Sequence, residues 1–500
     1  MLYFKVLIVC SLLLSPSVFA ATRYVDQDHP QCSDNPSGNQ PYCSITAALR
    51  DLRTGDTVRI RKSRRPYRVS VTSAQPGPIT IEADGQHRPV LTTDTSDTII
   101  RLTDASHWTI RNLTFDGQGK EVRYAIFVNA RSRHVHNINI QQNRFINLGG
   151  FAGTFKKPMA VRLTNSKWKK SKPNQHNYYV MDSTIAENVF DNCAHGGVLL
   201  SHTKNVTVAN NQMTHFRCGR FNDGRIGVQA IKVALSSLDT VIRGNRVGAF
   251  QPSSACPLQP GKHPKAGKTA RPVYAGIYCD VGSVKGLVAD NVVFDIDAGR
   301  SRPAPNHNGS STGIFIESRC TDWNVTNNLI YHIGTYGFRN GSKSTGSADR
   351  TAFTNNTVYG IAGHAISIQK GENLNIQHNI FSNYAGAAIE FVNFAKCRRS
   401  GRKCKITRET KAFHQHNHEI NYNLFWQGAP SGPIAIWFNR KSKLDLPGWQ
   451  QATGGYGGQS IYADPEFIGV KTGQFGLRNS SAANRKMAGE AFGYRAPGSQ

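Results

Sequence analysis

Most of the chain repeats one pattern of apolar and polar positions. From about residue 98 onward, a short apolar strand and a polar turn are followed by a second strand that ends in a pair such as Asn-Asn, and then by a third apolar stretch. Clear copies occupy residues 206–213, 288–294, 325–331, 353–359 and 376–381. Where no insertion intervenes, the copies recur every 23 to 28 residues or so. This period is typical of solenoids, whose coils stack because none can bury its apolar face alone.

Alternation within each strand places one side chain in the core and the next one outside. Aligned on this alternation, the repeats give one strand per coil, beginning near Ile100, Ile126, Val161, Val198, Ile231, Ile277, Ile314, Phe338, Ile366 and Ile389. We therefore predict an all-β solenoid of about ten or more coils, with Ile277, Ile314, Ile366 and Ile389 in one internal column. Asparagine recurs at the turns because it tolerates left-handed backbone and its amide stacks on the asparagine of the next coil.

The outward positions of the aligned strands carry an unusual set of side chains. The first outward position holds Arg101, Phe127, Arg162, Leu199, Lys232, Tyr278, Phe315, Arg339, Ser367 and Glu390. The position two residues later holds Thr103, Asn129, Thr164, Ser201, Ala234, Asp280, Glu317, Gly341, Gln369 and Val392. Adjacent coils lie about 4.8 Å apart, so each column is a line of neighbours along the solenoid. A merely solvated sheet would carry mixed short polar residues instead.

Charged groups beside aromatic rings suit sugar binding, because rings stack on the apolar face of a pyranose and ions bind its hydroxyl and carboxylate groups. We therefore predict a substrate-binding strip made of Lys232, Tyr278, Phe315, Arg339, Gln369 and Glu390. Four long insertions flank this strand, at residues 165–178, 251–272, 298–311 and 395–418. Insertions along one face form walls, and a walled groove binds an extended ligand.

Asp280 and Glu317 occupy the same outward column on adjacent coils, which places their carboxyl groups about one coil apart. Like charges at that separation raise one pKa or share a cation. Two functional interpretations follow: the acid and nucleophile of a glycosidase, or ligands for a hard cation such as Ca²⁺. The alternative is a solvated ion-pair network relieved by Arg319 or Arg339.

Residues 1–20 predict a secretory signal peptide, with a lone basic residue, a short apolar run and a small-residue cleavage site. No later segment has the roughly 18 consecutive apolar residues that span a membrane. We therefore expect a secreted or periplasmic protein. In an oxidising compartment the close pairs Cys32/Cys43 and Cys397/Cys404 are the predicted disulfides. The odd number of cysteines after cleavage leaves at least one thiol free.

The formal net charge of +28 implies a polyanionic partner: nucleic acid, a membrane surface or an acidic polysaccharide. The basic runs lie at residues 59–68, 156–172, 262–271 and 396–411, and any one of them can also be a solvated basic face. No nucleic-acid module, phosphate loop, dinucleotide fingerprint or nucleophile elbow appears in the sequence. We therefore expect an acidic polysaccharide as partner, and no nucleic acid.

The asparagine-rich turns, the G-I-x-I strands and passages at both ends of the chain (residues 23–26, 46–49, 55–58, 464–467 and 475–477) carry a family resemblance. They resemble the pectate-lyase-like right-handed parallel β-helix superfamily over nearly the whole mature chain. The resemblance implies a single-stranded right-handed parallel β-helix. We expect a monomer with a signal peptide at 1–20, an N-terminal cap and first coils at 21–97, the β-helix at 98–470 and a C-terminal tail at 471–500. This fold hosts lyases, hydrolases, epimerases and binding proteins, so the activity has to be argued from the site.

An acidic polysaccharide is cleaved by elimination when a cation neutralises the uronate carboxylate, a base removes the C5 proton and an acid assists the leaving oxygen. Residues 278–285 resemble the site coil of the chondroitinase-B-like and alginate lyase β-helix enzymes, in which an acidic-x-acidic pair binds Ca²⁺ and a lysine five residues after the second acid is the base. The resemblance makes Lys285 the base, with Tyr278 in place of the first calcium carboxylate. The family's arginine acid falls at Glu317, with Arg319 two residues away. The alternative for Lys285 is a solvated turn lysine.

We therefore expect a secreted enzyme that cleaves a uronate-containing polysaccharide by elimination, with Lys285, Arg319, Asp280 and Glu317 as catalytic residues. Asp280 and Glu317 are also the expected ligands of Ca²⁺, the cofactor that the resemblance suggests. Two alternatives stay open. One is a glycoside hydrolase that uses Asp280 and Glu317, and the other is a non-catalytic glycan-binding or surface protein. Ultraviolet absorbance of an unsaturated uronate product separates the lyase from the hydrolase.

Overall fold

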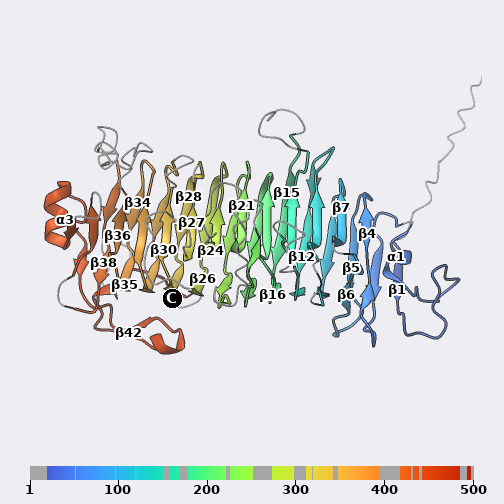
Figure 1. Cartoon of the computed structure of the whole chain (residues 1–500). Helices are drawn as coiled ribbons and strands as arrows, with labels where there is room; N and C mark the ends of the chain where they lie inside the picture. The colour runs from blue at the N-terminus through green and yellow to red at the C-terminus, as the bar shows by residue number, and fades with distance from the viewer. Residues whose placement is uncertain are drawn as a thin grey trace, which may run out of the picture.

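The computed structural model describes residues 20–50, 52–95, 97–118, 120, 122–149, 158–167, 177–220, 226–251, 273–297, 311–317, 319–341, 347–392, 417–429, 432–437, 442–484 and 492–496. The regular structure of these residues is almost entirely β-strand, stacked into one elongated body with the N-terminal and C-terminal coils at opposite ends (Figure 1). Each full coil contributes one strand to each of three long sheets. The predicted solenoid is confirmed.

Sheet 1 consists of β1 (Thr22–Val25), β2 (Thr57–Ile60), β5 (Ile79–Ala83), β8 (Trp108–Arg111), β11 (Val135–His136), β12 (Ile138–Gln141), β15 (Val180–Ala186), β18 (Thr203–Ala209), β22 (Val241–Arg243), β25 (Val284–Ala289), β28 (Thr321–Thr326), β31 (Ala352–Thr354), β34 (Asn375–Gln377) and β37 (Glu419–Asn421). Sheet 2 consists of β4 (Val71–Ser73), β7 (Thr98–Thr103), β10 (Tyr124–Asn129), β14 (Val161–Thr164), β17 (Val198–Ser201), β20 (Gly219–Arg220), β21 (Ile226–Ala234), β24 (Val273–Cys279), β27 (Ser311–Ile316), β30 (Tyr336–Asn340), β33 (His364–Ile368), β36 (Ile389–Phe391), β39 (Ala435–Trp437) and β40 (Ser442–Leu444). Sheet 3 consists of β3 (Tyr67–Arg68), β6 (Val90–Thr92), β9 (Thr114–Asp116), β13 (Arg144–Ile146), β16 (Val189–Asp191), β19 (Gln212–Thr214), β23 (Arg246–Gly248), β26 (Val292–Ile296), β29 (Leu329–Ile333), β32 (Thr357–Ile361), β35 (Ile380–Tyr384), β38 (Leu424–Trp426) and β41 (Ile461–Tyr462). Pairing along all three sheets is parallel, except that β20 and β40 pair antiparallel with β21 and β39.

Sheet 2 contains the strands that the repeat alignment brought together. Ile277 pairs with Ile314, and Ile366 pairs with Ile389. The other strands of the alignment follow the same register, from β7 to β36. All four isoleucines are at most 1% exposed. The predicted internal column is therefore confirmed.

Aromatic side chains from successive coils stack inside the helix. Phe145 lies between Phe115 and Phe190, with ring centroids 5.1 and 4.7 Å apart and the planes nearly parallel. All three rings are fully buried. Stacking places each ring on its neighbour in the next coil, so burial of apolar surface and ring contact stabilise the same inter-coil interface.

A ladder of buried asparagines runs along the turn between sheets 1 and 3. Each side-chain amide donates a hydrogen bond to the next side-chain carbonyl at 2.9–3.2 Å, through Asn143, Asn188, Asn211, Asn245, Asn291, Asn328, Asn356, Asn379 and Asn423. The predicted stacking of asparagine amides is confirmed. The stacked asparagines, however, do not themselves adopt the left-handed backbone that was also expected of them. The left-handed backbone belongs to the preceding residue, such as Asn210 with φ of 54° or Asn327 with φ of 50°.

Short helices close both ends of the stack. At the N-terminal end, α1 (Ile45–Ala48) is capped by Ser44, whose hydroxyl accepts from the Ala47 amide. At the C-terminal end, α3 (Leu446–Thr453) is capped by Asp445 and ends at Gly454, whose φ of 69° is the left-handed conformation of a helix terminus. Trp449 of α3 is fully buried and stacks on Phe391. Such caps cover apolar coil ends that would otherwise aggregate.

The chain after α3 returns along the outer face of sheet 3. It forms β42 (Phe467–Ile468), η3 (Val470–Thr472), β43 (Gly476–Leu477) and η4 (Ala482–Asn484). Phe475 lies 5.1 Å from the ring of Tyr331 and 5.2 Å from that of Tyr359. Farther on, the Arg495 amide donates to Asn327 Oδ1 at 2.7 Å. The described part of the predicted tail thus packs on the outer face of the β-strand stack. The predicted domain boundaries stay predictions.

The disulfide predicted between Cys32 and Cys43 is confirmed. Cys193 is a buried free thiol, which agrees with the odd cysteine count. The predicted Cys397/Cys404 pair and residues 1–19 of the predicted signal peptide lie outside the described residues. In the part of the chain that the structure describes, no helix is long and apolar enough to cross a membrane.

Candidate functional site

The outer column of sheet 2 brings the predicted binding residues side by side. Lys232 pairs with Tyr278, Tyr278 with Phe315, and Phe315 with Arg339. Arg339 then pairs with Ser367, and Ser367 with Glu390. The predicted order is therefore confirmed, whereas the walls stay predictions because most of each insertion (168–176, 252–272, 298–310 and 393–416) lies outside the described residues.

These side chains project away from the coil interior, yet they are buried. Lys232, Tyr278, Phe315 and Arg339 are between 5% and 8% exposed, and Glu390 is fully buried. A simple solvated face is therefore the wrong description of this strip. Burying charge costs several kcal/mol per ion unless each group is paired, so the partners of these residues define the site.

Lys232 and Asp280 form an ion pair at one end of the cluster. Lys232 Nζ lies 2.6 Å from Asp280 Oδ2 and 4.8 Å from the centre of the Tyr278 ring. The amide of Val281 donates a second hydrogen bond to Asp280 Oδ1 at 2.9 Å. Burial alone would raise the pKa of Asp280, but the Lys232 charge and these hydrogen bonds outweigh it and lower the pKa to about 2. Asp280 is therefore a carboxylate at any ordinary pH.

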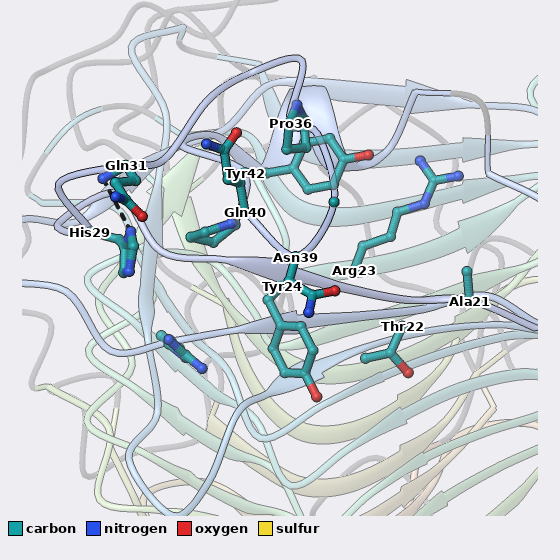
Figure 2. Close-up of a pocket in the computed structure, with 13 residues that line it drawn as sticks. Ala21, Thr22, Arg23, Tyr24, His29, Gln31, Pro36, Asn39, Gln40 and Tyr42 are labelled. Atoms are coloured by element: carbon teal, nitrogen blue, oxygen red, sulfur yellow. Dashed lines mark hydrogen bonds between the residues drawn. The ribbon is translucent and has the colours of Figure 1, made fainter.

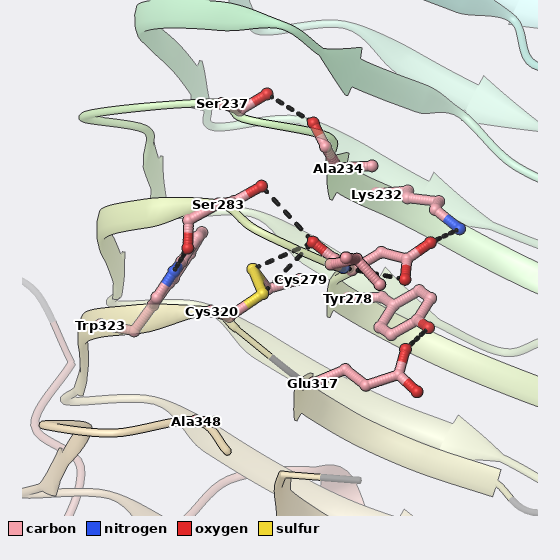
Figure 3. Close-up of a disulfide and its surroundings, with 12 residues drawn as sticks. Lys232, Ala234, Ser237, Tyr278, Cys279, Ser283, Glu317, Cys320, Trp323 and Ala348 are labelled. Atoms are coloured by element: carbon pink, nitrogen blue, oxygen red, sulfur yellow. Dashed lines mark hydrogen bonds and ion pairs between the residues drawn. A yellow bond between two sulfur atoms is a disulfide. The ribbon is translucent and has the colours of Figure 1, made fainter. Parts of the chain in front are cut away.

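Glu317 follows β27 on the next coil and behaves in the opposite way. Its Oε2 accepts a hydrogen bond from the Tyr278 hydroxyl (Figure 3). Burial and the negative charge of Asp280 raise the pKa of Glu317 above its usual value, against the opposing effects of Tyr278 and Arg339. The Glu317 amide donates to the Cys279 carbonyl at 3.0 Å, so Asp280 and Glu317 lie next to each other on adjacent coils. The pKa values of the two carboxyl groups are thus driven in opposite directions, and Glu317 holds a proton more tightly than Asp280 does.

Two stacked rings lie between two cations along the column. The rings of Tyr278 and Phe315 are 5.0 Å apart and nearly parallel. Arg339 covers the far face of the pair, with its guanidinium carbon 4.3 Å from the Phe315 centroid, as Lys232 covers the near one. Arg339 also donates to Gln369 Oε1 at 2.8 Å. This cation–ring–ring–cation stack fixes the position of four side chains in a largely dry strip.

A disulfide joins the two coils that carry the carboxyl groups. Cys279 immediately precedes Asp280, and Cys320 lies three residues after Glu317; the two cysteines are bonded (Figure 3). The sequence separation of 41 residues concealed this pair from a search for close cysteines. In register the partner of Cys279 is Ile316, and Cys320 comes four residues later, beyond the end of β27. The disulfide holds the backbones of both carboxyl-bearing turns together.

Glu390 belongs to a separate buried network farther along the column. Ser367 Oγ donates to Glu390 Oε2 at 2.8 Å, and His364 Nε2 lies 3.6 Å from Glu390 Oε1. The Ala387 amide donates to His364 Nδ1 at 3.0 Å, which requires that nitrogen to be unprotonated and leaves the ring proton on Nε2. Glu390 is therefore engaged with its own coil neighbours.

Lys285 and Arg319 lie apart from the carboxyl pair. Lys285 is exposed on β25 of sheet 1, and its charge helps to lower the pKa of Asp322. Arg319 is exposed on a turn, with its amide bonded to Ser347 O. Among the described residues, neither side chain forms a hydrogen bond or ion pair with Asp280 or Glu317. Their predicted roles as base and acid stay predictions.

The surroundings of Asp280 and Glu317 do not fit a calcium ion. Calcium takes about six to eight oxygen ligands, whereas the groups beside these carboxylates are the cations Lys232 and Arg339. Within the described ranges, no three His, Cys, Asp or Glu side chains gather into a metal site. The residues beside the carboxyl pair therefore give no support to the predicted calcium ion.

A separate cavity of about 850 Å³ opens beside β1 at the N-terminal end of the stack (Figure 2). Arg23 and Arg61 line it, together with Tyr24, His29 and Tyr42. The first arginine is paired with Asp56 and the second with Asp84. The residues that line the cavity include no Asp or Glu, so it is a weaker candidate for acid–base catalysis.

No protein-family model and no curated protein matches the sequence. Solved structures do match: the native GH136 lacto-N-biosidase from Eubacterium ramulus has a TM-score of 0.50 at 13% identity, over 88% of this chain and 67% of that one. Its selenomethionine derivative gives a TM-score of 0.51 at 13% identity, over 89% and 67%. The complex of XylC with xylose gives 0.50 at 9% identity, over 90% and 87%.

The chain is a right-handed parallel β-helix. This agreement over most of the chain confirms the fold that the sequence resemblance implied. Identities of 13% and 9% show the fold alone. The activity of this β-helix has to be argued from its own side chains.

Proposed function

We propose that this β-helix is a glycoside hydrolase acting on an acidic polysaccharide, with Glu317 as the general acid and Asp280 as the nucleophile. The observation that carries the proposal is a pair of half-buried carboxyl groups on adjacent coils whose pKa values are driven in opposite directions. Two carboxyl groups with separate protonation states are what glycosidic bond cleavage requires. This reverses the preference for elimination that the sequence favoured.

The proposed reaction has two steps. In the first, Glu317 gives its proton to the glycosidic oxygen while Asp280 attacks the anomeric carbon, which releases the leaving chain and forms a glycosyl ester. In the second, water attacks the anomeric carbon and gives a proton to Glu317, which releases the sugar and restores the Asp280 carboxylate. The two residues are one coil apart, which is about 4.8 Å. This spacing supports retention of configuration, because inversion needs a wider gap that admits a water between the carboxyl groups.

Neighbouring residues position the pair in this scheme. Lys232 keeps Asp280 ionised, and the Tyr278 hydroxyl orients Glu317. An acidic substrate is supported by the formal net charge of +28. A sugar ligand also suits the fold, since one protein that shares it is a lacto-N-biosidase and another is seen in complex with xylose.

Elimination is the second candidate. The cations Lys232 and Arg339 flank the aromatic pair, where they can neutralise the carboxylate of a uronate and so acidify its C5 proton. The base predicted for this reaction, Lys285, is exposed on another sheet. For this reason hydrolysis is the preferred proposal.

The test uses Glu317→Gln and Asp280→Asn, which keep the side-chain shape and remove the acid chemistry. Glu372→Gln is the matched control, because Glu372 is exposed on a turn away from the pair. Each protein is incubated with a panel of uronate-containing polysaccharides, and both reducing ends and ultraviolet absorbance are measured. We expect both site variants to lose about 10²-fold or more in turnover with their circular dichroism unchanged, while the control keeps full activity.

The outcomes separate the candidates. Reducing ends without an absorbing product support hydrolysis. An unsaturated, absorbing product would establish elimination and overturn the hydrolase. Normal turnover in both amide variants would show that Asp280 and Glu317 are not the catalytic pair. Binding to the panel without any product would leave a glycan-binding protein.

A further inference from the structure

A second pocket lies on the same face, toward the N-terminal end of sheet 2. It has a volume of about 380 Å³ and takes its lining from β7, β10, β14 and β17 and from the turn after β21. Its lining residues are Arg101, Arg123, Tyr124, Phe127, Arg162, Thr164, Asn165, Ser166, Ser201 and Leu235. Three arginines and no acid in one lining set indicate an anionic ligand.

The arginines are held flat against two aromatic rings. Tyr124 and Phe127 stack with their centroids 5.1 Å apart. The guanidinium of Arg101 lies 4.7 Å from the Phe127 ring, and that of Arg123 lies 5.0 Å from the Tyr124 ring. Arg162 contacts both rings and donates to the Tyr124 hydroxyl at 2.6 Å. Their planar donor groups are therefore oriented before any ligand arrives.

The three arginines of the pocket carry more positive charge than the neighbouring carboxylate neutralises. Asp97 is the carboxylate paired with Arg101, and it lies 4.0 Å from Arg123. Arg162 Nε is buried and has no hydrogen-bond partner in the part of the chain that the structure describes. A buried guanidinium donor normally has an acceptor. An oxyanion entering the pocket would supply both the missing charge and the missing acceptor.

The pocket lies on the same outer face of sheet 2 as the carboxyl pair. Phe127, Leu199 and Ala234 belong to one buried cluster on this face. From Phe127 the column takes four coil steps to Tyr278, through β14, β17 and β21, which is about 19 Å at about 4.8 Å a step. Leu235, at the pocket edge, is 41% exposed with φ of 46°.

We propose that this pocket binds the carboxylate of a uronate unit in the same polysaccharide chain that Asp280 and Glu317 cleave. The uronate anchors the chain several sugar units from the scissile bond, on the N-terminal side of the site. This inference rests on the proposed function for its place in catalysis, but binding itself does not require turnover. A sulfate ester on a sugar offers similar chemistry, so the test includes it.

The test compares Arg162→Gln and Arg123→Gln with Arg144→Gln. Arg144 is exposed on β13 of sheet 3, so its substitution makes the same change in charge on another face. Binding of oligogalacturonates from disaccharide to octasaccharide is measured by calorimetry, beside carboxyl-reduced and sulfated neutral oligosaccharides of the same lengths. We expect the two pocket variants to bind the long uronates about 10-fold or more weakly, with little change for the disaccharide or the reduced chains.

Three results would overturn the inference: equal affinity in every variant, an equal loss in Arg144→Gln, or a preference for the sulfated chain that Arg162 controls. The wild-type loss of affinity on raising the salt concentration should also shrink in the pocket variants, because fewer charges are then screened. If no substrate is turned over but Arg162→Gln still weakens uronate binding, the proposed catalysis fails and the anchor stands. If the enzyme hydrolyses its substrate as proposed but neither arginine substitution changes the affinity for uronate oligosaccharides, only the proposed anchor fails.

Discussion

Replacing Lys232 by methionine tests the electrostatic basis of the proposed site. Methionine keeps most of the apolar stem that packs on Tyr278 and removes the ammonium 2.6 Å from Asp280. The pKa of Asp280 stands at about 2 against a usual 3.8, and this difference corresponds to about 2–3 kcal/mol. Without Lys232, burial becomes the dominant influence on Asp280. Its pKa should therefore rise above 3.8, into a range that an enzyme assay can reach.

The assay is the pH dependence of kcat/KM between about pH 3 and pH 8. In the wild type the Asp280 nucleophile is ionised over this whole range, so activity should not fall on the acidic side until close to pH 3. In Lys232→Met the acid limb should move upward by about two pH units or more. Lys471→Met is the matched control, because Lys471 is exposed on η3. An acid limb that is identical in Lys232→Met and wild type would refute the reasoning.

The same substitution has a consequence for stability. Because the folded-state pKa of Asp280 is depressed, its ion pair stabilises the fold fully above the unfolded pKa of 3.8, and this contribution disappears as the pH falls through about 2. Lys232→Met should therefore lower the free energy of unfolding at neutral pH by about 2–3 kcal/mol or more. The difference between variant and wild type should shrink as the solution is acidified. Urea titrations at neutral and acidic pH measure both.

Two further predictions concern the scaffold. Asn291→Ala leaves the Asn245 amide and the Ile242 carbonyl without their side-chain partner, at about 1–3 kcal/mol each. Urea unfolding should therefore show a loss of about 2–6 kcal/mol, against a small effect of Asn383→Gly at an exposed position of β35. A loss below about 1 kcal/mol in Asn291→Ala would contradict the ladder's role. Burial raises the pKa of the Cys193 thiol to about 12, so maleimide followed by peptide mapping should leave Cys193 unlabelled in the native protein and label it in urea. Rapid native labelling would show that its coil opens readily.

The repeat alignment predicted the outer column of sheet 2 because strand periodicity is strict. A shift of one residue would have moved Ile277 outward and Tyr278 inward, so burial of one face determined the register. The alignment could not reveal that Lys232 and Arg339 are buried. The alternation of side chains along a strand shows which of them point outward, but it does not show what covers that outer face. The pairing of Cys279 with Cys320 needed the same three-dimensional view.

The surroundings of two parts of the site do not follow from the alignment of strands, for local reasons. Lys285 matches the family's spacing after Asp280 along the chain, and the turn at Gly282 carries the backbone from sheet 2 to sheet 1 before Lys285 is reached. Two residues with a given spacing along the chain therefore lie on different sheets when a turn between the sheets separates them. Arg123 and Tyr124 were overlooked because β10 begins before Ile126, where the alignment started.

The asparagine ladder makes the spacing between coils independent of the number of residues in each coil. Successive ladder residues are 23 to 46 positions apart, yet their amides meet at 2.9–3.2 Å throughout. A coil can therefore gain a loop of twenty residues without displacing its neighbours, and doubling a loop costs only about 0.6 kcal/mol of closure entropy. The ladder keeps the spacing between coils constant. Loops that determine substrate specificity can therefore vary in length while the two carboxyl groups remain one coil apart.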